Sequence, residues 1–154
     1  MSTIRVVVAD DDATMRRAIV DVLTAHGGFD VVREVATGEG LPELVSEHRA
    51  HLVVLDVRMP SGGPVAARAL RALTPSPVLV AVSASNDVAT VVAMLRAGVT
   101  GFLAKGRLGT TFADDLVRCA RGQVLIAVPQ GAQVLRALRD GAIDGQAERL
   151  RPRP

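Results

Sequence analysis

The sequence contains no tryptophan or tyrosine, and its three phenylalanines are Phe29, Phe102 and Phe112. Because single-stranded nucleic acids bind by stacking their bases on aromatic rings, this scarcity argues against a surface of that kind. The lone cysteine, Cys119, cannot form an internal disulfide, and its apolar helical surroundings predict a buried, reduced thiol of a cytoplasmic protein. No apolar run approaches the roughly 18 residues of a membrane span, and the N-terminal residues lack the layout of a signal peptide. We therefore expect no membrane partner.

Excess positive charge is confined to the C-terminal segment. Residues 1–132 contain 13 basic and 13 acidic residues, whereas the last 22 residues contain five arginines and three acids. This distribution indicates a solvated tail rather than a basic stripe across a nucleic-acid-binding domain. The length of 154 residues suits one domain with a short extension. We predict a domain over residues 1–122 and a C-terminal extension or linker over residues 123–154.

Hydrophobic periodicity predicts five alternating strand and helix segments. Strands with apolar runs are followed by helices with apolar residues at three- and four-residue spacing. This alternation is typical of an α/β fold, a doubly wound (βα)5 parallel sheet with helices on both faces. We expect the strand order 2-1-3-4-5, which would make it a flavodoxin-like sandwich. An extra strand or linker at 124–128, a helix at 130–139 and a mobile tail at 146–154 complete the prediction. The expected strands are 4–9, 31–35, 51–55, 78–82 and 101–104, and the expected helices are 13–26, a short one from 41, 65–73, 87–97 and 110–121.

Chemically active side chains stand at the end of four predicted strands. The first strand runs into Asp10, Asp11 and Asp12, and the third ends in Asp56. Ligand sites in open α/β sheets lie beyond the carboxyl ends of the strands, where the strand order reverses, so these acids are expected to meet. Converging carboxylates repel one another, and a divalent cation relieves that repulsion. Oxygen ligands without histidine or cysteine favour Mg²⁺, and we expect Asp12 to begin the first helix rather than bind the ion.

The fourth and fifth strands add a hydroxyl, Ser83, and a cation, Lys105. Lys105 is the single lysine in the chain, since 17 of its 18 basic residues are arginine. A compact ammonium on a flexible stem suits contact with one oxygen of a phosphoryl group. A metal-binding acid cluster, a nucleophilic carboxylate, a hydroxyl and an ammonium together form the equipment for an aspartyl-phosphate.

Four segments of the chain resemble the receiver domain of two-component response regulators. They occur in the family's order and spacing and cover roughly residues 4–122. Gly106 stands where many receivers carry proline. This replacement of proline is common in the subfamily with a LuxR/NarL-type helix-turn-helix output. The glycine-rich loop at 61–64 replaces a frequent Asp-Gly pair, so we expect this loop to be mobile. The matching segments are Val8-Ala9-Asp10-Asp11-Asp12-Ala13-Thr14-Met15-Arg16-Arg17, Leu55-Asp56-Val57-Arg58-Met59-Pro60, Val82-Ser83-Ala84 and Gly101-Phe102-Leu103-Ala104-Lys105.

The resemblance implies a role for each matching residue. Asp56 corresponds to the phosphoacceptor, and Lys105 to the cation that contacts the phosphoryl group. Asp11 corresponds to a direct ligand of Mg²⁺, and Asp10 to a ligand that acts largely through water. The remaining roles are the backbone carbonyl of Arg58 as a metal ligand with Asp56, the hydroxyl of Ser83 as a phosphoryl hydrogen-bond donor and switch residue, and Phe102 as the aromatic switch.

The function that follows is a signalling switch rather than an enzyme. The resemblance implies that a sensor histidine kinase donates the phosphoryl group, and that the chain itself performs only the transfer to Asp56 and a slow autodephosphorylation. We expect the output to be transcriptional, through a DNA-binding domain that these residues do not include, with a stand-alone single-domain regulator as the alternative. Because the outer side of helix 87–97 carries few charges, we expect a homodimer through that helix, strand 101–104 and helix 110–121. The small or apolar residues predicted to be exposed there are Ala89, Thr90, Ala93, Met94 and Ala97.

Two other functions stay open at this stage. A Mg²⁺-dependent phosphohydrolase with an aspartyl-phosphate intermediate uses two acids two residues apart on the first strand, and Asp10 and Asp12 have that spacing. It leaves Asp56 without a role, and the chain has no room for a cap over the site. A receiver-like dimerisation module that works without phosphorylation is the other alternative.

Overall fold

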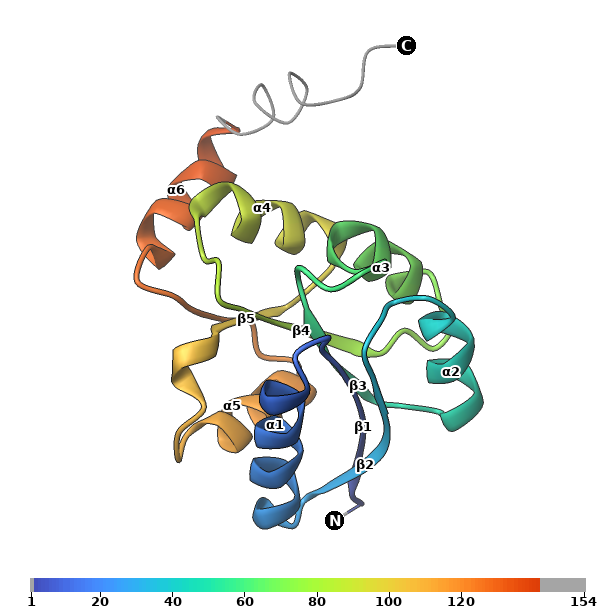
Figure 1. Ribbon diagram of the computed structural model, residues 1–154. Coiled ribbons are helices and arrows are strands. Elements are labelled where there is room, and N and C mark those ends of the chain that lie inside the picture. The colour runs from blue at the N-terminus through green and yellow to red at the C-terminus, as the bar shows by residue number, and fades with distance from the viewer. Residues whose placement is uncertain (1, 142–154) are drawn as a thin grey trace.

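The computed structural model describes residues 2–141 as one parallel sheet covered by helices on both faces (Figure 1). The strands lie in the order β2-β1-β3-β4-β5-β6, so the predicted fold class and the order of the first five strands are confirmed. The strand order changes direction between β1 and β3, and ligand sites in such sheets form at this switch point. In chain order the elements are β1 Ile4–Ala9, α1 Ala13–His26, β2 Phe29–Val35, α2 Leu41–His48, β3 Leu52–Asp56, α3 Gly63–Arg71, β4 Val78–Ser83, α4 Val88–Ala97, β5 Gly101–Ala104, the 3-10 turn η1 Lys105–Arg107, α5 Phe112–Ala120, β6 Leu125–Ala127 and α6 Gly131–Asp140.

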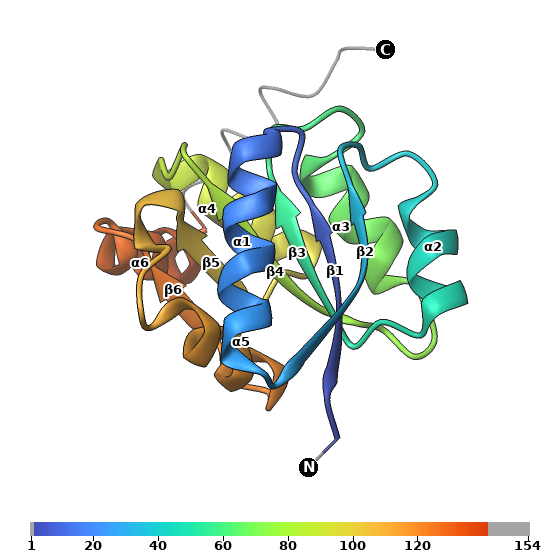
Figure 2. The same cartoon turned by 60° about the horizontal axis from the view of Figure 1, so that its bottom comes forward.

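Two hydrophobic clusters hold the helices against opposite faces of the sheet. One cluster joins the strands to α2, α3, α4 and α6, and the other joins them to α1 and α5. Every residue of β3 is buried, as expected for a central strand with a helix layer on each side. The two layers are visible on either side of the sheet in the rotated view (Figure 2).

Side-chain caps begin α1 and α4. The carboxylate of Asp12 accepts hydrogen bonds from the backbone nitrogens of Thr14 and Met15, at 3.0 and 3.2 Å. Asp87 accepts one from the backbone nitrogen of Thr90 at 2.9 Å. The prediction that Asp12 begins the helix is therefore confirmed, and this separates it from the two acids before it.

Several element boundaries differ from the sequence prediction by one or two residues, among them those of β2 and α3. β2 begins at Phe29 rather than at residue 31, because the buried Phe29 ring packs into the α1–α5 cluster and extends the pairing with β1. α3 runs over Gly63–Arg71 rather than 65–73, because Pro64 fits the first turn of a helix.

The C-terminal extension forms ordered structure against the domain. The segment predicted as an extra strand or linker pairs with β5 as β6, and the predicted helix forms as α6. The Val134 side chain on α6 is fully buried in the cluster that also contains Phe102. α6 lies beside α4 (Figure 1). The tail predicted to be mobile, 146–154, lies outside the described residues.

The predicted exposure of α4 is wrong at two positions. Met94 and Ala97 are both 0 % exposed, although the sequence placed them on the outer side of the helix. α4 packs against α3 as well as α6, so more than one side of the helix is covered. The surface predicted for dimerisation is therefore narrower than expected, and β6 occupies the free edge of β5.

Among residues 2–141, no helix combines the length and hydrophobicity needed to cross a membrane.

Candidate functional site

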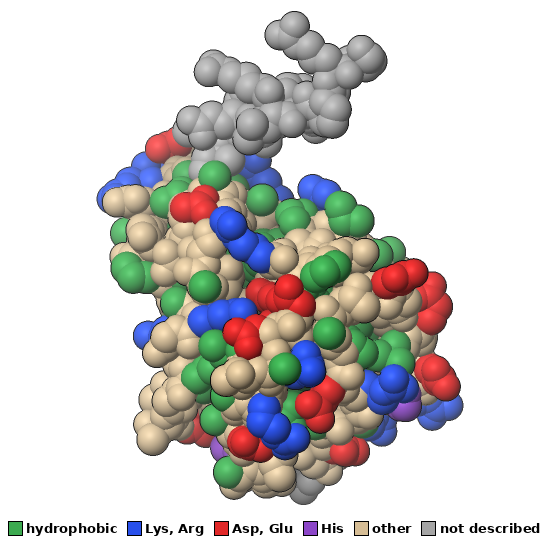
Figure 3. Space-filling model, viewed as in Figure 1, with side chains coloured by type: hydrophobic (Ala, Val, Ile, Leu, Met, Phe, Trp, Pro, Cys, Tyr) green, Lys and Arg blue, Asp and Glu red, His purple; other side chains and the backbone are tan. Residues whose placement is uncertain are grey.

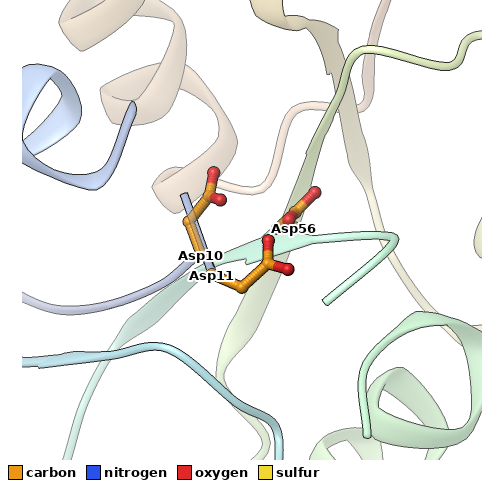
Figure 4. Close-up of side chains that lie close together, drawn as sticks. All are labelled: Asp10, Asp11 and Asp56. Carbon is orange, nitrogen blue, oxygen red and sulfur yellow. The ribbon is translucent and has the colours of Figure 1, made fainter. Parts of the chain in front are cut away.

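Three carboxylates converge beyond the carboxyl ends of β1 and β3. Ala9 is paired with Leu55 in the parallel ladder, so Asp10 and Asp56 follow at the same level of the sheet. Asp10, Asp11 and Asp56 each offer an oxygen within 4.8 Å of the others (Figure 4). Asp10 and Asp56 are buried and Asp11 is exposed. The arrangement is a buried pair of acids with a third at the solvent side.

Lys105 brings the counter-charge to this cluster. Its Nζ lies 3.1 Å from Oδ2 of Asp10 and 3.5 Å from Oδ1 of Asp56. β5 places it there, because Ala104 is paired with Ser83 at the end of β4 and Lys105 is the next residue. The side chain of Lys105 is only 15 % exposed, and the pKa of this ammonium is raised despite its burial, through the two carboxylates.

The pKa of Asp56 is raised from 3.8 to about 6. Burial is the largest cause, since loss of water disfavours the charged carboxylate, and the negative charge of Asp10 adds to it. Lys105 and a long contact from the backbone nitrogen of Arg58 act in the opposite direction. The single ammonium therefore does not neutralise the cluster.

A second cation fits between these carboxylates. Oδ2 of Asp10 is buried and accepts no hydrogen bond from the described residues, since the Lys105 ammonium lies near it but outside hydrogen-bonding geometry. Burying a carboxylate oxygen without a hydrogen bond is costly, and one ammonium offsets only part of the charge of three carboxylates. The set is all oxygen and contains no histidine or cysteine, which suits Mg²⁺. The carbonyl of Arg58 as a further ligand stays a prediction.

A polar network that the sequence did not reveal lies beside the site. The Ser83 hydroxyl accepts a hydrogen bond from the backbone nitrogen of Ser85 at 3.0 Å. The Arg58 guanidinium donates to the Ser85 hydroxyl at 2.9 Å, and this hydroxyl donates to Asp87, the cap of α4, at 3.1 Å. Arg58 and Ser85 each stand two residues beyond a strand end, so a search of strand ends alone misses them. The network links the loop after β3 to the start of α4.

The loop after β3 is held by the loop after β2. The Pro60 carbonyl accepts hydrogen bonds from the backbone nitrogen of Gly38 at 2.9 Å and from the Thr37 hydroxyl at 3.1 Å. A Cβ on Gly38 would lie 1.9 Å from the carbonyl oxygen of Ser61, so only glycine fits. These hydrogen bonds hold Pro60, the residue just before the glycine-rich loop, and the mobility of residues 61–64 stays a prediction. Gly38 carried no signal in the sequence, because its role depends on a loop more than 20 residues away.

Gly38→Ala is expected to weaken Mg²⁺ binding about tenfold, as displacement of groups that orient metal ligands typically does. The added methyl forces the loop that contains Arg58 away from its present position, because the atom it meets is backbone. Isothermal titration calorimetry with Mg²⁺ measures the effect. Gly131→Ala is the control, since a Cβ there would make only an ordinary contact of 3.6 Å. Equal affinities of the two variants would show that the two loops are not coupled.

Acidic and basic side chains lie side by side near the middle of the face shown in Figure 3. Within the acid cluster Asp11 is exposed to solvent, while Asp10 and Asp56 are buried.

Comparison with known proteins agrees with this geometry. Residues 6–110 match the family model described as the response regulator receiver domain. The chain is 35 % identical over 126 residues to the "Probable transcriptional regulatory protein NarL" of Mycobacterium tuberculosis, covering 80 % of this chain and 58 % of that protein. It is 31 % identical over 102 residues to the chemotaxis protein CheY of Bacillus subtilis, covering 66 % of this chain and 84 % of that protein.

The solved structures include the signal receiver domain of the response regulator NarL from M. tuberculosis. It superimposes with a TM-score of 0.76 at 32 % identity, covering 80 % of this chain and all of that domain. The chain spans less than two thirds of the length of the NarL protein that it matches. The family match covers more than half of the chain and includes the Asp10, Asp11, Asp56 and Lys105 positions. The chain belongs to the family of response regulator receiver domains.

Proposed function

We propose that this chain is a phosphorylation switch in which Asp56 accepts a phosphoryl group from a phosphohistidine of a sensor histidine kinase. The observation that carries the proposal is the pairing of Lys105 with both Asp10 and Asp56, at 3.1 and 3.5 Å, inside a cluster of three acids. Mg²⁺, when bound, would neutralise charge on the transferred group. Family membership supports a two-component partner and a place in the cytoplasm.

Each residue of the site has a separate role in the phosphoryl transfer. An oxygen of Asp56 forms the new bond to phosphorus while the bond from phosphorus to the kinase imidazole breaks and its electron pair stays on the imidazole nitrogen. Lys105, already within 3.5 Å of Asp56, is placed to contact an oxygen of the transferred group. Asp10 and Asp11 would hold the cation. At pH 7, above its pKa of about 6, the Asp56 carboxylate is ionised and able to attack.

The switch would act through Ser83 and the elements behind it. Its hydroxyl oxygen accepts a bond from Ser85, so its proton is available to donate to a phosphoryl oxygen. Movement of Ser83 would disturb the chain of hydrogen bonds through Ser85 to the cap of α4, and Phe102 lies on the neighbouring strand. We propose that the readout is control of transcription through a DNA-binding domain, since the NarL relative is described as a transcriptional regulator.

The structure does not favour the phosphohydrolase alternative, because Asp12 is not placed to act as its catalytic acid. Asp12 would have to serve as that acid, yet its carboxylate is exposed and accepts two backbone hydrogen bonds as the cap of α1. It also lies outside the group of acids that converge on one point. This arrangement favours the receiver function, in which Asp56 is the nucleophile.

Incubation with acetyl phosphate and Mg²⁺ tests the proposal. We expect each chain to gain one phosphoryl group, seen by intact mass spectrometry, and to gain none when EDTA is present. Continued turnover of small phosphate esters without a trapped phosphoprotein would instead support the hydrolase. A stable dimer that takes up no phosphoryl group, with or without Mg²⁺, would support the phosphorylation-independent module.

A further inference from the structure

A buried carboxylate on α5 takes no part in the site described above. Asp115 is 5 % exposed and stands on the apolar stripe of α5, between Phe112 and Cys119. Phe112, Leu116 and Cys119 are all buried, so an apolar side chain would be expected at position 115 as well. A buried charge at such a place is costly unless it is paired.

The partners of Asp115 are two arginines at long distance. Nη2 of Arg107 lies 3.8 Å from Oδ2 of Asp115, and Nη1 of Arg118 lies 3.7 Å from Oδ1. Oδ2 is buried and accepts no hydrogen bond from the described residues, because Arg107 is near enough for an ion pair but too far for a hydrogen bond. Arg118 belongs to α5 itself, whereas Arg107 comes from a different element.

Arg107 ends the 3-10 turn η1, and Lys105 begins it. The turn is thus attached at both ends to carboxylates, through Lys105 to Asp10 and Asp56 and through Arg107 to Asp115. Gly106 stands between them, and a Cβ there would meet no described atom within 4 Å. β5 fixes the start of the turn through Ala104. Because Gly106 leaves the backbone after it free, the ion pairs at the two ends contribute to the position of the rest of the turn.

We propose that Asp115 is a positioning residue that acts through Arg107 to hold the η1 turn, and so to place the Lys105 ammonium against Asp10 and Asp56. This inference rests on the proposed function for its kinetic consequence, but the placement of Lys105 can be measured without any phosphoryl transfer. A carboxylate in the first turn of α5 also interacts favourably with the helix dipole. Asp114, in the same turn and exposed, shares that interaction and serves as its control.

The single lysine makes Lys105 directly observable. In protein labelled with ¹³C-lysine, the one side-chain Cε signal reports the surroundings of the ammonium. We expect Arg107→Ala and Asp115→Asn to move this signal in the same direction. Arg118→Ala and Asp114→Asn should leave it in place, although each also removes a charge from α5.

The rate of labelling by acetyl phosphate provides the second measurement. Arg107→Ala and Asp115→Asn are expected to slow it about tenfold, because small misplacements of a catalytic group have effects of this size or larger, whereas Arg118→Ala should stay within about twofold. Circular dichroism confirms that each variant folds. If Arg107→Ala and Arg118→Ala behave alike in both measurements, the inference is wrong. If the unmodified chain takes up no phosphoryl group, the proposed function fails while the lysine signal still decides the positioning role.

Discussion

Asp56→Asn is expected to abolish phosphoryl uptake completely and, at the same time, to stabilise the metal-free protein at pH 7 by about 1–3 kcal/mol. The loss of uptake follows because an amide cannot form the aspartyl-phosphate. The gain in stability follows because Asp56 is 4 % exposed and shares its site with Asp10, so its ionisation opposes folding. A nucleophile that is also a destabilising residue is typical of a reactive site.

The direction of the stability change on Asp56→Asn follows from the pKa of Asp56 in the folded and unfolded states. The pKa of Asp56 is about 6 in the folded protein and near 3.8 when unfolded, so between these values the folded state binds the proton more strongly. The contribution of this group to stability is therefore fully present below about pH 4 and is lost as the pH rises through 6. We expect the stability gained from Asp56→Asn in EDTA to be clear at pH 7 and to vanish near pH 4.

Chemical unfolding monitored by circular dichroism measures the effect, since the chain has no tryptophan or tyrosine for fluorescence. Asp12→Asn is the matched control, because asparagine also caps helices and Asp12 lies outside the acid cluster. Adding Mg²⁺ should stabilise the unmodified protein more than the Asp56→Asn variant. An Asp56→Asn variant less stable than the parent in EDTA at pH 7 would contradict the description of the site as a repulsive cluster.

Val134→Asp is expected to detach α6 from the domain and to lower the free energy of unfolding by about 3 kcal/mol. The Val134 side chain is fully buried in the cluster that contains Phe102 and the inner residues of α4. A carboxylate there would have no partner, and the helix at the end of the described chain can leave more easily than the core can rearrange. The loss is therefore limited to the free energy with which α6 docks.

Leu135→Asp supplies the matched control on the same helix. Leu135 is 58 % exposed, so the same change one residue later is expected to alter stability by less than about 0.5 kcal/mol. Hydrogen exchange should show loss of protection in α6 and β6 for Val134→Asp while β1, β3 and β4 stay protected. Equal effects at the two positions would mean that α6 does not depend on this contact.

The same pair of variants bears on the proposed division of the chain at residue 122. If residues 1–122 form a self-sufficient domain, detachment of α6 leaves the acid cluster and Mg²⁺ binding intact. Detachment would also uncover part of α4, whose Met94 and Ala97 are buried in the present structure. The homodimer that we propose through α4, β5 and α5 would then form more readily, which sedimentation of the Val134→Asp and Leu135→Asp variants would reveal.

The sequence by itself determined the class of fold and the chemical groups of the site. Alternating apolar segments predict a parallel sheet, and the carboxyl ends of parallel strands meet at one edge. The sequence therefore predicted that Asp10, Asp11, Asp56 and Lys105 lie close together. The register of the ladders agrees with this: Asp10 and Asp56 follow the paired residues Ala9 and Leu55, and Lys105 follows Ala104, which is paired with Ser83. Local signals also sufficed for Asp12, because a cap depends only on the next few residues.

Only the tertiary structure decided which groups touch across long separations. Residue 38 has to be glycine because of the Ser61 carbonyl, and Met94 and Ala97 are buried because α4 packs among its neighbours. Asp115 on the buried face of α5 is paired with Arg107, which comes from a separate turn. None of these contacts repeats with a helical or strand period, so no pattern in the sequence reports them. They arise because packing and electrostatic interactions depend on distance in space, whereas sequence patterns record only distance along the chain.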